Sequence, residues 1–117
     1  MKKIFVVEDD VDTLDIMEWI LQDNGYAVIK TNRLVSINEI ISINPSLAIL
    51  DVLLLYGFGS DLCLAIKNNP KSNHIPVILY SANNNLKKLA HDSLADAYLA
   101  KPFDRDKLLQ MVNETIL

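Results

Sequence analysis

The chain has 117 residues, half of them hydrophobic, which is enough for one buried core and too little for a second. Its formal net charge of −4 and scattered lysines and arginines exclude a nucleic-acid surface, because a phosphate backbone requires a basic stripe. We therefore expect a single domain over residues 1–117 that makes no direct nucleic-acid contact.

The first apolar run, Ile4–Val7, is too short for a signal peptide or a membrane span. Cys63 is the only cysteine, which excludes an intramolecular disulfide and suits a reducing compartment. We expect a cytoplasmic protein without a membrane partner.

The run Ile4–Val7 predicts a buried strand, and three acidic residues, Glu8, Asp9 and Asp10, follow it directly. Apolar residues at three- and four-residue spacing then predict a helix over Val11–Asp23, with Asp10 as its N-cap. Carboxylates therefore mark the point where the first strand ends.

The next elements repeat this alternation. Ala27–Thr31 is predicted as a strand and Leu34–Ile43 as a helix. Leu47–Asp51 is predicted as a strand: four apolar residues end on the carboxylate Asp51, as expected for a strand buried on both faces of a parallel sheet. An apolar loop over residues 52–59 follows it.

The second half of the chain continues in the same way. A helix capped by Ser60 ends near Asn68, and the last helix is opened by Asp104. Between them the predicted elements are the strand Pro76–Tyr80, which ends on Ser81, the helix Leu86–Leu94, and the strand Ala97–Ala100, which ends on Lys101.

This order predicts an α/β fold: a five-stranded parallel doubly wound sheet, flavodoxin-like in its order 2-1-3-4-5, with five helices on two faces. Strands one and three are then neighbours about 4.8 Å apart, so Glu8, Asp9 and Asp51 share one pocket. Three carboxylates repel one another unless a hard cation such as Mg²⁺ lies between them. Ser81 and Lys101 reach the same edge, and the set can hold a phosphoryl group while an aspartate attacks it.

The whole chain resembles the receiver (phosphoacceptor) domain of two-component response regulators. Four fragments carry the resemblance, in order and at strand ends: Val6-Val7-Glu8-Asp9-Asp10, Leu50-Asp51 with Gly59 eight residues later, Leu79-Tyr80-Ser81-Ala82, and Asp96-Ala97-Tyr98-Leu99-Ala100-Lys101-Pro102-Phe103.

The resemblance implies a phosphorylation-dependent switch that receives its phosphoryl group from a sensor histidine kinase or a histidine phosphotransfer protein. It also implies an effector that binds the face formed by helix four, strand five and helix five. The implied site has Asp51 as phosphoacceptor, Glu8, Asp9, Asp51 and the Leu53 backbone carbonyl as Mg²⁺ ligands, Ser81 and Lys101 on the phosphoryl group, Ser81 and Tyr98 as switch residues, and a cis Lys101–Pro102 bond.

The chain departs from the family pattern at a few positions. Leu55 stands where proline is usual, and Leu94-Ala95 stands where Gly-Ala is usual. No output domain follows Leu117 in this sequence, so the chain is either a stand-alone receiver or a piece of a longer regulator.

Each polar residue also has an ordinary structural interpretation. Asp9 can favour the start of a helix, and Asp51 and Ser81 can be turn residues. Lys101 can be a solvated surface residue, and Tyr98 can be a residue that packs on an edge strand. Their coincidence at one sheet edge is what favours a site.

Two other functions stay open. One is a Mg²⁺-dependent phosphohydrolase with an aspartyl-phosphate intermediate, and the other is a receiver that binds partners without phosphorylation. Such phosphatases usually carry a second aspartate two residues after the nucleophile, where this chain has Leu53. We therefore predict a switch that is no enzyme beyond its own phosphoryl transfer and slow self-dephosphorylation.

Overall fold

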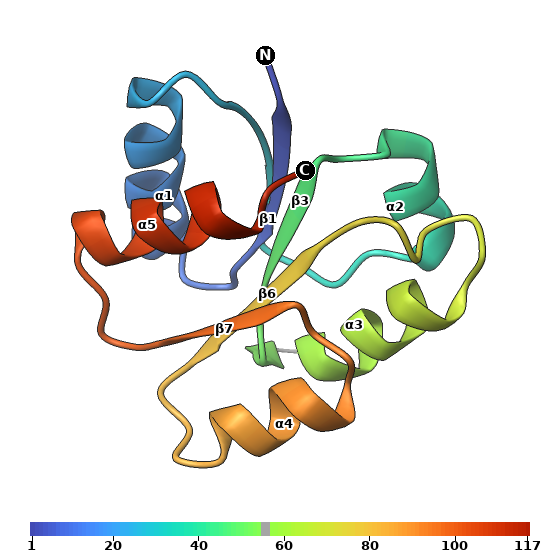
Figure 1. Ribbon diagram of the computed structural model, residues 1–117. Helices are drawn as coiled ribbons and strands as arrows, with labels where there is room; N and C mark the ends of the chain where they lie inside the picture. Colours follow the sequence, from blue (N-terminus) through green and yellow to red (C-terminus); the bar gives the residue numbers. More distant parts are fainter. Residues whose placement is uncertain (55–56) are drawn as a thin grey trace.

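Five parallel strands form the central sheet of the computed structural model, which describes residues 1–54 and 57–117 (Figure 1). The strand order is β2-β1-β3-β6-β7, which confirms the predicted order 2-1-3-4-5 when these strands are counted along the chain. The strands are β1 (Lys3–Val7), β2 (Ala27–Thr31), β3 (Leu47–Asp51), β6 (Val77–Ser81) and β7 (Ala97–Ala100).

Helices cover both faces of this sheet. In Figure 1, α1 and α5 lie together on one side, whereas α2, α3 and α4 lie on the other. The helices are α1 (Val11–Asp23), α2 (Ile37–Ile43), α3 (Gly59–Asn68), α4 (Leu86–Asp92) and α5 (Arg105–Thr115).

The strands are mostly apolar because each face of the sheet packs against helices, and β3 and β6 are buried at all five positions. In β1, Ile4 and Val6 belong to the core beneath α1 and α5, and Phe5 and Val7 belong to the core beneath α2, α3 and α4. Alternate side chains of a strand point to opposite faces, so a doubly covered sheet requires apolar residues at every position.

Several helix ends differ from the prediction. The helix predicted from Leu34 begins at Ile37, because Ser36 caps it by accepting a hydrogen bond from the Glu39 amide at 3.2 Å. The predicted Ser60 cap is wrong: α3 begins at Gly59, and Phe58 holds the N-cap position.

The ends of the last two helices follow from their local backbone. α4 stops at Asp92, before the predicted Leu94, whose φ of 64° lies in the left-handed region. The Asp104 cap of α5 is confirmed, since its side chain accepts from the Lys107 amide at 2.8 Å.

The segment predicted as a loop over residues 52–59 contains a short antiparallel ribbon. β4 (Leu53–Leu54) pairs with β5 (Gly57–Phe58). Leu55, where the family pattern has proline, lies outside the described residues. No helix in the described part of the chain is long and apolar enough to cross a membrane.

Candidate functional site

Three carboxylates meet at the carboxyl ends of β1 and β3. The parallel pairing places Val7 beside Leu50, so the residues that follow are also neighbours. Glu8, Asp9 and Asp51 each offer one carboxylate oxygen, and these oxygens lie within 4.8 Å of one another. Glu8 is 1% exposed and Asp51 is 5% exposed, so two of the three charges lie in a buried environment.

Lys101 reaches this cluster from β7, two strands away from β3. Its Nζ atom donates to Asp51 Oδ2 at 3.0 Å and to Glu8 Oε1 at 3.1 Å. The Lys101–Pro102 bond is cis, as expected. The structure therefore brings a cation to the carboxylates from a point far along the chain.

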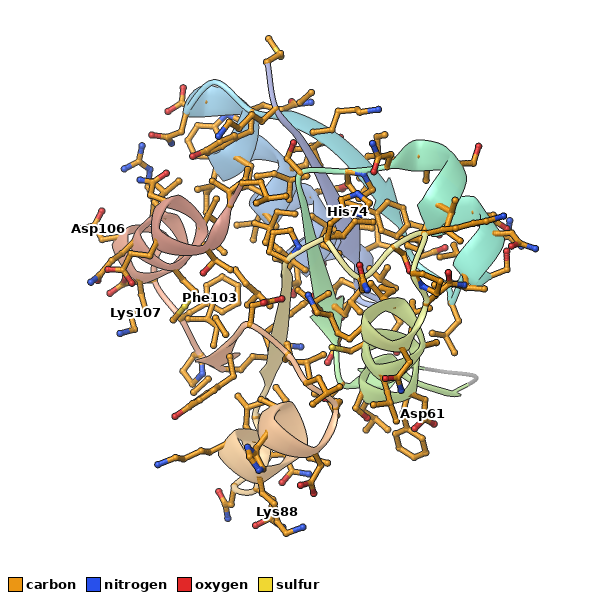
Figure 2. The ribbon with its side chains drawn as sticks, turned by 45° about the vertical axis from the view of Figure 1, so that its right-hand side comes forward. Asp61, His74, Lys88, Phe103, Asp106 and Lys107 are labelled. Carbon is orange, nitrogen blue, oxygen red and sulfur yellow. The ribbon has the colours of Figure 1, made fainter. Side chains whose placement is uncertain are left out.

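Tyr80 contacts Lys101, a role that was not predicted from the sequence. The Lys101 Nζ atom lies 4.6 Å from the centroid of the Tyr80 ring, which is a cation–π distance. The Tyr80 hydroxyl donates to the Val7 carbonyl at 3.3 Å, and its ring packs edge-on against Phe103, the residue labelled ahead of α5 in Figure 2. The only sequence signal that bears on Tyr80 is strand alternation, which places the Tyr80 and Ser81 side chains on opposite faces of the sheet.

The electrostatics of the cluster show which charges the fold disfavours. Burial, together with the hydrogen bond and charge of Asp51, raises the pKa of Glu8. Burial and the neighbouring Glu8 also raise the pKa of Asp9. Burial alone would lower the pKa of Lys101, but its hydrogen bonds to Asp51 and Glu8 outweigh burial and raise it.

The residues present fit a hard divalent cation. All three donors are carboxylate oxygens, the ligand type that Mg²⁺ prefers. The buried Oε2 atom of Glu8 has no hydrogen-bond partner among the residues that the structure describes. A buried acceptor without a partner is costly, and a cation would satisfy it.

Ser81 and Lys101 lie with Asp51 in one pocket of about 500 Å³. Ser81 ends β6, and its Oγ atom accepts from the Asn83 amide at 3.0 Å. The backbone amide of Leu53 donates to Asp51 Oδ1 at 3.3 Å, while the proposed metal contact of the Leu53 carbonyl stays a prediction. Hydroxyl, ammonium and carboxylate groups thus face a common space.

Gly59 allows the chain to approach Asp51 closely. A Cβ atom at this position would lie 1.9 Å from the Asp51 carbonyl oxygen, which no side chain can tolerate. The spacing of eight residues between Asp51 and Gly59 therefore has a steric cause.

Tyr98 lies outside this pocket. Its side chain is 41% exposed on β7, where it lines a groove of about 590 Å³ together with residues of α4 and α5. Figure 2 shows Lys107 on the α5 side of the molecule and Lys88 projecting from α4. The predicted switch residue Tyr98 therefore lies in a different groove from the predicted phosphoacceptor Asp51.

The response regulator receiver domain model matches residues 4–113. The chain therefore belongs to the receiver domain family of two-component response regulators, a class of phosphorylation-dependent switches. It is 39% identical to the uncharacterized transcriptional regulatory protein YbdJ of Bacillus subtilis, covering 95% of this chain and 49% of that protein. It is 28% identical to protein PilG of Pseudomonas aeruginosa, covering 92% and 82%. The chain spans about half the length of several curated regulators that it matches.

Solved structures agree with this assignment. The response regulator TrrA of Thermotoga maritima, in complex with Mg²⁺-BeF, superposes with a TM-score of 0.86 at 26% identity, covering 97% of this chain and 98% of that one. The receiver domain of a histidine kinase from Syntrophus aciditrophicus gives a TM-score of 0.87 at 26% identity, covering 97% and 89%. A neighbour that holds a metal supports a metal site in this fold.

Proposed function

We propose that Asp51 is the phosphoacceptor of this receiver and that its phosphorylation changes which partner the domain binds. The observation that carries the proposal is the position of Lys101, whose ammonium bridges Asp51 and Glu8 in a pocket that also contains Ser81. This arrangement places positive charge and a hydroxyl beside a carboxylate that can act as a nucleophile.

The transfer is an in-line displacement. A carboxylate oxygen of Asp51 forms a bond to phosphorus, and the phosphorus–nitrogen bond of a donor phosphohistidine breaks, with its electron pair leaving on the imidazole. Lys101 and Ser81 are placed to contact the phosphoryl oxygens, where negative charge is spread in the transition state. Glu8, Asp9, Asp51 and the Leu53 carbonyl would hold Mg²⁺, which when bound offsets the charge of the carboxylates and the phosphoryl oxygens.

The alternative phosphohydrolase is disfavoured by residue 53. A leucine two residues after Asp51 supplies no acid or base to the pocket, and its side chain is 64% exposed at the pocket wall. We propose that the domain is no enzyme beyond its own phosphorylation and slow self-dephosphorylation. Turnover of p-nitrophenyl phosphate at enzyme-like rates would reinstate the phosphohydrolase.

The proposed phosphoryl donor is a sensor histidine kinase or a histidine phosphotransfer protein, and the proposed effector binds the face of α4, β7 and α5. The groove beside Tyr98 on that face supports the effector proposal. We further propose that residues 1–117 act as one domain, in the cytoplasm, without direct contact to nucleic acid or membrane.

The experiment is phosphorylation with acetyl phosphate and Mg²⁺, read by intact mass. We expect a single phosphate adduct in the wild type and no adduct in Asp51→Ala or in EDTA. Asp61→Ala is the matched control, because Asp61 is an aspartate in the first turn of α3 that does not belong to the carboxylate cluster. An adduct that persists in Asp51→Ala would contradict the assignment.

A further inference from the structure

The ribbon of β4 and β5 carries an apolar pair at the edge of the Asp51 pocket. Leu53 and Phe58 are paired directly across the two strands, so their side chains leave the same face of the ribbon. Both line the pocket that contains Asp51, and they are 64% and 52% exposed. Two large apolar side chains therefore lie in solvent beside the proposed phosphoacceptor.

The position of this pair is fixed by contacts at the base and the back of the ribbon. The Gly59 amide donates to the Val52 carbonyl at 2.8 Å, next to the point where Gly59 approaches Asp51. On the other side, a Cβ atom at Gly57 would lie 2.4 Å from Cδ1 of Leu34, so the ribbon packs closely against that side chain. The ribbon is thus held between the end of β3 and the segment before α2.

The Phe58 side chain does not cap α3, the helix that it precedes. It occupies the N-cap position of α3 without a side-chain hydrogen bond, where Ser, Thr, Asp or Asn would accept from an amide of the first turn. Figure 2 shows Asp61 of that first turn projecting outward from α3. A side chain that neither caps the helix nor enters the core, and that faces the pocket, breaks local rules in the way that functional positions do.

We infer that Phe58, together with Leu53, forms an apolar rim that slows water attack on the phosphoryl group and so lengthens the life of the phosphorylated state. This inference rests on the proposed function of Asp51. In hydrolysis, a water oxygen forms the bond to phosphorus, the bond between phosphorus and the Asp51 oxygen breaks with its electrons returning to the carboxylate, and the water proton leaves with inorganic phosphate. The rim fills volume that this water needs and offers it no hydrogen bond for alignment.

The test compares the wild type with Phe58→Ser, Phe58→Leu, Leu53→Ala, Phe58→Ala and the double variant Leu53→Ala/Phe58→Ala. Each protein is labelled with acetyl phosphate, freed of the donor, and followed in excess Mg²⁺ by intact mass. Leu64→Ser is the matched control, since Leu64 is an exposed apolar residue of the neighbouring helix α3 that is not among the residues lining the pocket. The free energy of unfolding is measured for each variant by urea titration.

We expect Phe58→Ser to lose phosphate at least about threefold faster, equivalent to about 0.65 kcal/mol of activation free energy, while its free energy of unfolding stays equal or rises because serine caps α3. Phe58→Leu should keep most of the wild-type lifetime, and Leu64→Ser should keep all of it. The increase in the rate of phosphate loss in the double variant should be smaller than the product of the increases in Leu53→Ala and Phe58→Ala if the two side chains act as one rim.

The outcomes separate this inference from the proposed function. A wild type that takes no phosphate overturns the role of Asp51 and the rim with it. A wild type that is labelled, beside a Phe58→Ser variant that decays at the same rate or more slowly, overturns the rim alone. A folded Phe58→Ser variant that takes no phosphate also overturns the rim, because Phe58 would then be required for transfer.

Discussion

The Lys101 ammonium lies 3.0 Å from Asp51 Oδ2, although the two residues are 50 positions apart and their strands are separated by β6. The positive charge that the proposed phosphoryl transfer needs is therefore in place before any phosphate arrives. A preorganised charge costs no rearrangement at the moment of reaction, which is the main way in which such sites stabilise a transition state.

Removing this charge should slow phosphorylation. We expect Lys101→Ala to reduce the rate of labelling by acetyl phosphate at least about tenfold, or about 1.4 kcal/mol of activation free energy. In the metal-free protein the variant should lose about 1–3 kcal/mol of unfolding free energy, because Asp51 and Glu8 lose their shared donor. Lys88→Ala is the control, since the Lys88 ion pair lies on the surface of α4. Equal labelling rates in Lys101→Ala and the wild type would contradict the role of Lys101.

Glu8 should destabilise the metal-free fold at neutral pH. Because its pKa is raised in the folded state, the stability linked to this group is full below its ordinary value of 4.5 and is lost as pH rises through the raised pKa. In EDTA, Glu8→Gln should therefore be more stable than the wild type near neutral pH, by roughly 1–2 kcal/mol, and the difference should shrink as pH falls. Mg²⁺ should stabilise the wild type more than the variant. Urea titrations with and without Mg²⁺ measure both effects, and a less stable variant in EDTA would count against this account.

Phosphorylation should change the conformation of the face formed by α4, β7 and α5. A phosphate on Asp51 can draw in the Ser81 hydroxyl and free space for the exposed Tyr98 side chain. A shift from 1:99 to 99:1 between two states requires only about 5.5 kcal/mol. We expect beryllofluoride with Mg²⁺ to change the backbone amide chemical shifts of residues 81–103 in NMR spectra. Unchanged shifts in that range would exclude the coupling.

A polar side chain at position 53 should shorten the phosphorylated state. Leu53 and Asn83 both line the Asp51 pocket, and only Asn83 offers a hydrogen bond to a water. We expect Leu53→Asn to speed phosphate loss, most of all in combination with Asn83→Glu or Asn83→Gln. Decay of the purified phosphoprotein in excess Mg²⁺ is the measurement. Slower decay in Leu53→Asn would show that access at this position does not set the lifetime.

The left-handed backbone of Leu94 should cost stability. Its φ is 64° and its side chain is 52% exposed, so little packing compensates for the strain. We expect Leu94→Gly to raise the free energy of unfolding by about 1 kcal/mol. Gly25→Ala is the converse test: its φ is 88°, and no atom beyond the adjacent residues lies within 4 Å of the added Cβ, so backbone strain alone should lower stability by a similar amount. Urea titration of both variants decides, and a destabilised Leu94→Gly would contradict the argument.

The sequence by itself determined the sheet and the residues along its functional edge. In β3 the four residues before Asp51 are all apolar because both faces of the strand are covered, and this pattern predicts a parallel strand whose last residue reaches the ligand-binding edge. The predicted strand order places β1 beside β3, so Glu8 and Asp51, at the ends of these strands, are predicted to be neighbours. Helix ends marked by a side-chain cap were also readable, as at Asp104.

The tertiary structure decided what depends on contacts between distant segments. The ring of Tyr80 beneath Lys101 results from the packing of β6 against β7, which no local pattern encodes. The ribbon that pairs Leu53 with Phe58 is only two residues long on each strand, too short for a period-two signal, and it is held by its contacts with Asp51 and Leu34. Local sequence specifies which residues can stand at the edge of a sheet, whereas three-dimensional packing fixes which side chain touches which.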